Sequence, residues 1–584
     1  MNKKIVIYWL SPCITLGFAI WFWHIPQQPP LEISDNQLKE VLSDIANATA
    51  LGAKDLDLER FSAKTKAKAI FLSYYSATSG VQSAFKIQAD LSDVAELYQK
   101  LQKNTSDVMP TTIKLDIINP LSRQQSTQVT KKNSDLGLYA LEVGTGEGIH
   151  ILSDQIMAWM IYSSEKGFHA KRALERFKQL YGVTPKQEAV FRSKNPNLHW
   201  HQQISYIYQN GQASATYRGR KKHPENLTSK DIIEGIDIAE HYIMNSVRDN
   251  GQFNYLYYPH SDKIHEKKYN ILRHAGTIYS MLSLYQWRKN PKLWDKINET
   301  LAFLRSTFQP CPPEHQSQLC VIEQGYTKIG GACLTLLAIS LYLDIAPSEE
   351  LMIEGKALAN RIMSLQGAEG QFLRHKESYP EGIDSKFISG YYPGEAIYGL
   401  SAFYRHTKDK RMLDSAEKGA LWIAKIRDRE KSIENLAHDH WLLYGINEIS
   451  KHRKNLDLEN HTLKLLRTIM NDQVDTSPYL DWVGGFRKFP TSASTATSSE
   501  GMLAGLEHIN RAKLDFDKDK LINTIERALK VQLATQLNEE KAMFTLKPNQ
   551  SLGGFGKTSF EYKIRIDNVQ HNLSAFLMSL EILP

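Results

Sequence analysis

The chain has 584 residues, of which 42% are hydrophobic and 23% charged, a composition that excludes a disordered or fibrous protein. Its 71 Lys and Arg against 64 Asp and Glu give a net charge of +7. These charges form no dense basic stripe with interleaved aromatic residues, so nucleic acid is not a predicted partner. The length exceeds what one hydrophobic core supports and predicts two to four domains.

The N-terminus has the pattern of a membrane anchor. Lys3 and Lys4 precede an uncharged stretch at 5–23, which as a helix would rise about 28 Å, close to the thickness of the hydrocarbon core. No small-residue cleavage site follows, which favours an uncleaved signal anchor over residues 1–26. Because flanking lysines stay cytoplasmic, we expect one pass through the inner membrane, with the bulk of the chain periplasmic. Residues 27–35 then form a polar, Pro-rich stalk.

Residues 36–215 are expected to form a small α+β domain whose role the sequence does not indicate. The stretch 36–103 is interpreted as mostly amphipathic helix, whereas 111–118 and 136–143 alternate as strands do. The glycine cluster at 144–148 lacks the Gly-Lys-Ser/Thr ending of a Walker A loop and is not a convincing dinucleotide fingerprint. We interpret it as a hairpin turn before a helix near 154–164, and we predict no cofactor.

Six segments in the last 320 or so residues each open with a charged or hydrogen-bonding residue and continue as a largely apolar helix. They begin at Arg273-His274, Lys328, Pro393-Gly394-Glu395, Asp439-His440, Ser499-Glu500 and Asp567. A helix that is apolar on most of its surface is normally buried. Amphipathic helices are expected between them, at 227–248, 291–306, 348–365, 410–426, 455–471 and 517–534.

The alternation of outer and inner helices indicates a repeat architecture. The stretch 284–295 matches 403–414 in its pattern, and each marks the end of an inner helix, a tight turn and the next outer helix. A Gly-x-Phe element also recurs and predicts short hairpins. It occurs at 251–253, 370–372, 484–486 and 553–555.

With these features, residues 226–584 resemble the six-hairpin (α/α)6 toroids, which include six-hairpin glycosidases, N-acylglucosamine 2-epimerase-like enzymes and the glucuronyl C5-epimerase C-terminal domain. The best-matched stretch is 390–396, followed by Tyr404, Lys408 and Asp409. The resemblance implies a mainly α fold with a toroid of six helical hairpins. Such toroids host hydrolases, lyases, epimerases and non-catalytic proteins, so the fold does not settle the reaction.

The polar starts of six inner helices would converge at one mouth of such a ring, where each would perturb the pKa of its neighbours. The candidate catalytic residues are Glu395, Asp439, His440, His274, Glu500 and His571. For any one of these carboxylates, a helix cap is the simpler interpretation. Glycoside hydrolysis needs two carboxylates, which Glu395 and a partner could supply. Epimerisation or elimination needs an acid and a base, a role that suits imidazoles.

Other residues at the same mouth are candidates for substrate binding. Aromatic side chains can stack on a sugar, and cations can bind the carboxylate of a uronic acid. The candidates are Tyr391, Tyr392, Arg273, Lys328, Arg565, Asp567 and Gln570.

The four cysteines are too few for a disulfide scaffold. Cys311 and Cys320 flank a probable loop and would pair in an oxidising compartment, whereas Cys333 is interpreted as a small core residue. No Cys/His ligand set occurs at the usual spacings, so no metal site is predicted.

These features together predict a membrane-anchored, exported, carbohydrate-active protein acting on an envelope or exported glycan. Among the possible reactions, hydrolysis is favoured because carboxylates outnumber imidazoles at the helix starts. The alternatives are a uronate epimerase or lyase that uses His/Glu acid–base pairs, and a non-catalytic envelope binding or assembly protein. No sequence feature predicts an oligomeric state.

Overall fold

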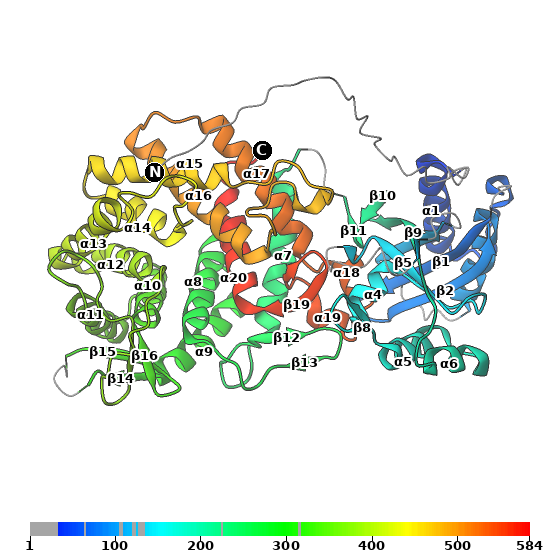
Figure 1. The fold of residues 1–584 in the computed structure, drawn as a ribbon, viewed down its shortest axis with the longest axis horizontal. Helices are drawn as coiled ribbons and strands as arrows, with labels where there is room; N and C mark the ends of the chain where they lie inside the picture. Colours follow the sequence, from blue (N-terminus) through cyan, green and yellow to red (C-terminus); the bar gives the residue numbers. More distant parts are fainter. Residues whose placement is uncertain are drawn as a thin grey trace, which may run out of the picture.

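A computed structural model describes residues 33–62, 66–103, 109–119, 124–125, 135–222, 226–312 and 317–584. The signal anchor predicted at 1–26, with its spanning segment at 5–23, and most of the stalk lie outside the described residues. Within the described ranges, no helix is both long and apolar enough to cross a membrane. A sheet-containing part and a larger helical ring lie side by side along the long axis of the molecule (Figure 1).

The part before the ring is built on an antiparallel sheet. Its strands follow the order β11-β10-β9-β3-β1-β2, and β4 and β5 also pair with β9, while β6 pairs with β5. The strands are β1 (Ala67–Ser76), β2 (Gly80–Ala89), β3 (Thr112–Ile118), β4 (Gln124–Gln125), β5 (Tyr139–Val143), β6 (His150–Ile151), β9 (Leu198–Gln209), β10 (Gln212–Tyr217) and β11 (Arg220–Lys221). The helices are α1 (Asp35–Ala50), α2 (Val94–Gln102), α4 (Ser153–Trp159), α5 (Ala170–Tyr181) and α6 (Pro185–Arg192), and β7 (Tyr162–Ser163) and β8 (Gly167–Phe168) form a separate hairpin.

The interpretation of 36–103 as mostly helix is wrong, because β1 and β2 lie inside it. Strand β1 is buried along nearly its whole length, so apolar residues occupy both of its faces and the alternation that marks a half-exposed strand is missing. A short, continuously apolar run cannot be told from a buried helix by its period. The sheet also continues past residue 215 through β10 and β11.

The ring consists of six inner and six outer helices. The inner helices are α8 (Ile271–Arg288), α10 (Ile329–Ile345), α12 (Tyr392–Thr407), α14 (His440–Ser450), α16 (Ser492–Ala512) and α20 (Ile566–Ser579). The outer helices are α7 (Ser229–Asn245), α9 (Pro291–Ser306), α11 (Glu349–Ser364), α13 (Lys410–Trp422), which continues as the π-helical η4 (Ile423–Arg427), α15 (Leu456–Asn471) and α17 (Lys518–Thr535). Two short helices, α18 (Glu539–Ala542) and α19 (Pro548–Ser551), follow α17.

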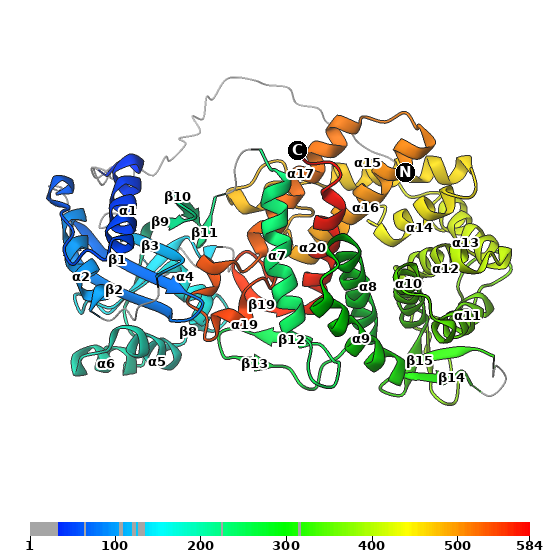
Figure 2. The ribbon, with the colours of Figure 1, turned by 180° about the vertical axis from the view of Figure 1, so that it is seen from behind.

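The inner helices close on themselves, since each packs against the next and α20 returns to pack against α8 (Figures 1 and 2). Strand β12 (Leu256–Tyr258), near the start of the ring, pairs with β19 (Glu561–Arg565), near its end. The backbone N–H of Ser229 also donates to the carbonyl of Pro584. The predicted (α/α)6 toroid of six helical hairpins is therefore confirmed.

Two small sheets lie directly before inner helices. One contains β13 (Lys263–Ile264), β12, β19 and β18 (Gly556–Thr558), and the other β14 (Phe308–Pro310), β15 (Leu319–Glu323), β16 (Tyr326–Lys328) and β17 (Lys376–Ser378). In the second sheet, Cys311 and Cys320 form a disulfide beside the β14–β15 pairing, so the two cysteines expected to pair do so.

The two turns singled out by self-similarity have the same backbone geometry. Lys289 ends α8 and Lys408 ends α12 in the left-handed region, with φ of 55° at both residues. Asn290 and Asp409 then accept a hydrogen bond from the backbone N–H two residues later and cap the next outer helix.

The Gly-x-Phe elements are short hairpins. The phenylalanines form isolated bridges with residues that follow outer helices, as Gln473 does with Phe486. Gly484 has a φ of 98°, and a Cβ there would lie 2.4 Å from the carbonyl oxygen of Arg527 on the next outer helix. The side-chain amide of Gln473 donates to the carbonyls of Gly484 and Thr524, both at 2.8 Å. One glutamine thus ties the hairpin to the next outer helix.

The same arrangement recurs around the ring. Gln366 donates to the carbonyls of Gly370 and Ser415, and Gln536 donates to those of Gly235 and Gly553. These buried amide hydrogen bonds form a repeated link between neighbouring hairpins.

We predict that Gln473→Leu destabilises the ring, because it leaves two buried carbonyls without their donor. A hydrogen bond contributes about 0.5–1.5 kcal/mol, and an acceptor left unsatisfied costs about 1–3 kcal/mol. The free energy of unfolding, measured by urea denaturation, should fall by about 2 kcal/mol or more. Gln550→Leu, at an exposed position, is the control and should change it by less than about 0.5 kcal/mol. Equal stability of both variants would show that the glutamine link is not stabilising.

Candidate active site

The N-terminal ends of the inner helices share one face of the ring, which we call the mouth. Because the hairpins repeat, all inner helices run the same way, and the strands of the two small sheets lie in the connections that precede α8, α10, α12 and α20. The predicted site residues come from the helix starts, with one exception. Helix α16 begins at Ser492, capped by Thr491, so Glu500 lies about two turns inside it.

Three predicted catalytic residues meet at the mouth. His571 Nδ1 donates to Glu500 Oε2 over 2.8 Å, and the rings of His571 and His440 lie 5.5 Å apart between centroids. The possible ligand atoms of His440, Glu500 and His571 all lie within 4.8 Å of one another. We call these three residues the imidazole cluster.

The two imidazoles of the cluster differ in their partners. Both ring nitrogens of His440 are buried and have no hydrogen-bond partner among the described residues. Burial, together with the charge of His571, holds the pKa of His440 well below 6.5. Burial also lowers the pKa of His571, but the Glu500 carboxylate more than offsets this and raises it above 6.5. His571 therefore holds a proton more strongly than His440 does, and this difference suits a pair in which one imidazole acts as acid and the other as base.

Glu500 is the buried counter-ion of the cluster. Burial raises its pKa, and the neighbouring His571 partly offsets that rise. Its other oxygen accepts a hydrogen bond from Tyr444, with 3.4 Å between the oxygens. Tyr444 stacks on Tyr398, and Trp441 packs against His440 with ring centroids 4.7 Å apart. These aromatic residues line the inside of the ring below the cluster.

A charged group lies beside the cluster. Asp567 accepts from Arg273 at 2.9 Å and from Arg565 at 2.5 Å, so two guanidinium groups share one carboxylate. The Arg273 guanidinium also bonds the hydroxyl of Tyr255. Asp567 raises and Arg273 lowers the pKa of His571, which places both within electrostatic reach of the cluster. One positive charge remains uncompensated within this group of three.

Glu395 lies in the ring wall. A Cβ on Gly330 of α10 would be 2.5 Å from Glu395 Oε2, and this oxygen has no hydrogen-bond partner among the described residues. Burial, and then the charge of Asp439, holds the pKa of Glu395 well above its usual range. Asp439 caps α14 by accepting from the N–H of Leu442 and pairs with Arg427 at 3.1 Å. The contacts place Glu395 with Asp439 and join neither side chain to Glu500 or His571.

His274 faces the outer layer and not the mouth. Its Nδ1 accepts from the Tyr269 hydroxyl at 2.6 Å, and its Nε2 donates to the carbonyl of Thr300 on α9 at 2.9 Å. Phe253 and Phe303 pack against the ring. Both ring nitrogens of His274 therefore form hydrogen bonds within the ring wall, and this geometry supports a packing role.

The remaining predicted binding residues are dispersed. Lys328 pairs with Glu323 at 2.6 Å, and Gln570 lies against Gly276 between α20 and α8. Tyr392 is buried against His375. Tyr391 is 48% exposed, and its ring lies 6.2 Å from that of His440, so it remains beside the cluster.

Sequence reasoning did not single out Tyr444, Trp441 or Arg427. Tyr444 lies four residues after His440, and this spacing puts both on the same face of a helix. Once His440 was a candidate, this spacing could have identified Tyr444. Arg427 comes from the π-helical end of α13, and no helix-start pattern marks it.

Two imidazoles and a carboxylate also form a ligand set that zinc accepts, although no metal site was predicted. With bonds of 2.0–2.1 Å in a tetrahedron, ligand atoms lie about 3.3 Å apart. The 2.8 Å between His571 Nδ1 and Glu500 Oε2 is instead a hydrogen-bond distance. The geometry favours proton sharing between these two groups.

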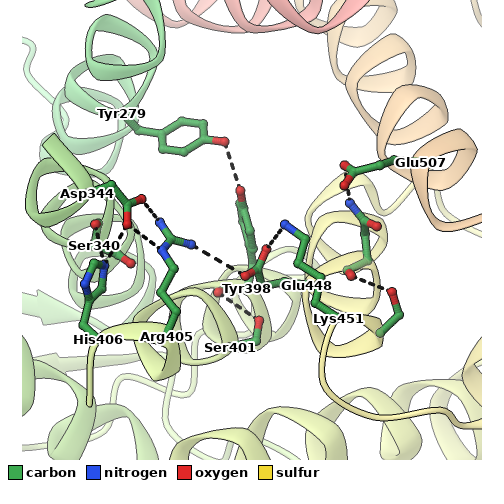
Figure 3. Close-up of polar contacts among 12 residues, drawn as sticks. Tyr279, Ser340, Asp344, Tyr398, Ser401, Arg405, His406, Glu448, Lys451 and Glu507 are labelled. Atoms are coloured by element: carbon green, nitrogen blue, oxygen red, sulfur yellow. Dashed lines mark hydrogen bonds and ion pairs between the residues drawn. The ribbon is translucent and has the colours of Figure 1, made fainter. Parts of the chain in front are cut away.

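The opposite end of the ring holds a cavity of about 460 Å³, lined by Tyr279 and Tyr398, whose hydroxyls are 3.0 Å apart. Figure 3 shows Arg405 between Asp344 and Glu448, with Nε 2.9 Å from Asp344 and Nη1 3.6 Å from Glu448. Lys451 also pairs with Glu448. These charges neutralise one another, whereas the mouth holds an unpartnered imidazole. The mouth is therefore the candidate active site.

No protein-family model and no curated protein sequence matches this chain. Solved structures match about 60% of this chain. A sugar epimerase from a ruminal bacterium has 11% identity and a TM-score of 0.47, covering 60% of this chain and 98% of that one. Cellobiose 2-epimerase from Bacillus thermoamylovorans has 11% identity and a TM-score of 0.46, with 60% and 98% covered.

An inactive variant of an α-1,6-mannanase from a Salegentibacter species, in complex with α-1,6-mannotetrose, has 9% identity and a TM-score of 0.43. It covers 61% of this chain and 99% of that one. At this identity the likeness concerns the fold alone.

We predict that the two cluster imidazoles titrate on opposite sides of 6.5. His571, whose folded pKa is raised, contributes stability that is present below 6.5 and lost as the pH rises through its folded pKa. His440, whose folded pKa is lowered, reduces stability as the pH falls below 6.5. NMR titration of ¹⁵N-labelled histidine, assigned with His440→Gln and His571→Gln, measures both pKa values. Glu500→Gln should lower the pKa of His571, and an unchanged value would refute the pairing.

Proposed function

We propose that this protein is a membrane-anchored, exported carbohydrate-active enzyme that moves a proton at a carbon atom of a sugar, as epimerases, isomerases and lyases do. The observation that carries this proposal is the imidazole cluster. A neutral His440 and a protonated His571 lie side by side, and Glu500 holds the proton on the second.

The roles follow from the protonation states. Neutral His440 takes a proton from a carbon next to a carbonyl or carboxylate group. Its ring nitrogen that carries the lone pair can accept this proton, because neither ring nitrogen has a hydrogen-bond partner among the described residues. His571, with Nδ1 bound to Glu500, presents Nε2–H to the oxygen on which negative charge develops. Arg273 carries part of the remaining positive charge beside His571 and orients a carbonyl or carboxylate oxygen. Tyr391, which is 48% exposed, offers a face for the sugar ring.

Glycoside hydrolysis through Glu395 is the second candidate. One observation favours it, because a buried, protonated Glu395 next to Asp439 has the charge state of a general acid. Two contacts argue against hydrolysis. Glu395 Oε2 packs beside Gly330 in the ring wall, and the Asp439 carboxylate already caps α14 and pairs with Arg427. We therefore place proton transfer ahead of hydrolysis.

Export is the second part of the proposal. The positive N-terminus and the uncharged stretch at 5–23 support an inner-membrane anchor with the bulk of the chain periplasmic. The Cys311–Cys320 disulfide supports the same side of the membrane, since disulfides persist in oxidising compartments.

Incubation of the full chain in D₂O with a panel of reducing disaccharides and uronate oligosaccharides tests the reaction. Epimerisation or isomerisation should place deuterium on a carbon of the product, and elimination should leave a carbon–carbon double bond; NMR and mass spectrometry detect both, whereas hydrolysis releases a new reducing end with neither change. His440→Gln and His571→Gln should each lower the rate by about 10²–10⁴. Glu395→Gln should keep most of the activity.

The opposite pattern would overturn the assignment. Loss of activity in Glu395→Gln but not in His440→Gln, with no deuterium in the product, supports hydrolysis. Wild-type activity abolished by EDTA and restored by zinc would instead assign the cluster to a metal. His274→Gln is the matched imidazole control, because its ring faces the wall, and any loss it causes should appear in stability and not in turnover.

A reporter fused after Pro584 tests export. Alkaline phosphatase, which needs an oxidising compartment, should be active, and a cytoplasmic reporter at the same position should not. In protein isolated from membranes, thiol labelling before reduction should leave Cys311 and Cys320 unmodified. Labelling of both cysteines, or an active cytoplasmic reporter, would reject the proposed location.

A further inference from the structure

A second cavity, separate from the mouth, lies where the sheet meets the ring. It encloses about 430 Å³, a volume typical of small-molecule sites. One wall is the β10–β11 hairpin, and the other is α17 with the loop after α15. In Figures 1 and 2, β11 and α18 lie at this junction.

The lining of this cavity is strongly cationic. Its basic residues are Arg218, Arg220, Lys221, Lys222, Arg527 and Lys530, and its one acidic residue is Asp481. Asp481 is already used, because it pairs with Arg218 at 3.2 Å and accepts from the Ser559 hydroxyl. Among the described residues, no carboxylate pairs with the side chain of Lys221 or Lys222. Arg527 also pairs with Asp475 at 2.8 Å, so the excess positive charge of the cavity rests on Arg220, Lys221 and Lys222.

Arg220 lacks partners within this lining. Its Nε and Nη1 are buried and have no hydrogen-bond partner among the described residues. Among the acids, Glu540 has the largest electrostatic effect on Arg220, ahead of Asp231 and Glu234, but its oxygens accept from Gln209, Asn538 and the backbone N–H of Lys221. A buried guanidinium with unpaired N–H groups is costly unless an acceptor reaches it.

Lys541, next to the cavity, is affected by the same positive charge. Burial, and then the charge of Arg220, lowers the pKa of Lys541 on α18 to about 7. Its ammonium group donates to the carbonyls of Ala534 and Ser559, both of which belong to residues that line the cavity. An added anion would lie close to this group.

The rest of the lining is apolar. Leu480, which is 63% exposed, lines the cavity together with Val483, Val531 and Ala534. A wall of aliphatic side chains under a cationic rim fits a ligand with an apolar body and an anionic head.

We propose that this cavity binds an amphiphilic anion, with a phosphate-type head against the basic residues and an apolar body along the aliphatic wall. The head would receive N–H groups from Arg220 and ammonium groups from Lys221 and Lys222. Guanidinium and ammonium groups are the usual protein ligands of phosphate. This inference does not depend on the reaction proposed for the mouth.

Titration calorimetry on the full chain in phosphatidylcholine nanodiscs tests the proposal with hexyl phosphate, inorganic phosphate and hexanol as probes. Hexyl phosphate should bind at one site, at least tenfold more tightly than inorganic phosphate, and hexanol should not bind. The double variant Lys221→Glu/Lys222→Glu should weaken hexyl phosphate at least tenfold. Leu480→Ser should weaken hexyl phosphate several-fold and leave inorganic phosphate unchanged.

Lys194→Glu, at an exposed position of the same part of the chain, is the matched charge control and should bind as the wild type does. Circular dichroism confirms that each variant is folded. No binding of hexyl phosphate to the wild type would overturn the proposal. Equal weakening by Lys194→Glu would overturn it too, because the effect would then be long-range charge. Equal binding of the two phosphates would remove the apolar part of the site.

The source of the head group is tested by changing the lipid. In nanodiscs of phosphatidylglycerol, a hexyl phosphate affinity at least tenfold lower than in phosphatidylcholine supports a lipid head group as the occupant. Equal affinity in both lipids supports a soluble amphiphilic anion. Sensitivity to the Lys221→Glu/Lys222→Glu change should accompany either result, and its absence in both lipids would overturn the site.

Discussion

The close approach of neighbouring inner helices is the constraint on which the rest of the ring depends. Six helices close on themselves only if their seams are narrow, and glycines on the seams make this possible. A Cβ on Gly501 would lie 3.2 Å from the Cα of His440, and one on Gly330 would lie 2.5 Å from Glu395 Oε2. Polar residues at the helix starts are thereby enclosed between helices, and water cannot solvate them. Burial then becomes the largest influence on their pKa values.

The same narrow seams separate structural from candidate functional side chains. His274 and His440 are both buried imidazoles at helix starts, but His274 satisfies both nitrogens within the wall and His440 satisfies neither. A buried polar group without a partner costs about 1–3 kcal/mol. Hydrogen bonds such as those of Gln473 offset this cost elsewhere in the ring. Under the proposed function, the substrate supplies the partner that His440 lacks among the described residues.

The sequence predicted the features that depend on local chemistry. The outer helix at 291–306 coincides with α9, and the turns at Lys289 and Lys408 were identified from their repetition. Features that depend on which way a side chain turns were not predictable. Successive helix residues differ by about 100° in direction, so Arg273 can face the mouth while His274 faces α9. The start of α16 was missed because Ser492–Ser499 is a run of small polar residues that reads as a loop, although it is helical.

His440 and Arg220, the unsatisfied groups at the centre of the two proposals, lie in different parts of the molecule and differ in what they require. The neutral imidazole of His440 has no charge to balance, so a weakly polar sugar can approach it without a counter-ion. Arg220 keeps its charge even where burial lowers its pKa to about 10, so only an anion or an acid can compensate it. The neutral His440 is enclosed in a ring that closes through narrow seams at glycines. The charged Arg220 lies instead where two packed parts of the molecule meet. Under the two proposals, the site of proton transfer and the site of anion binding are therefore separate.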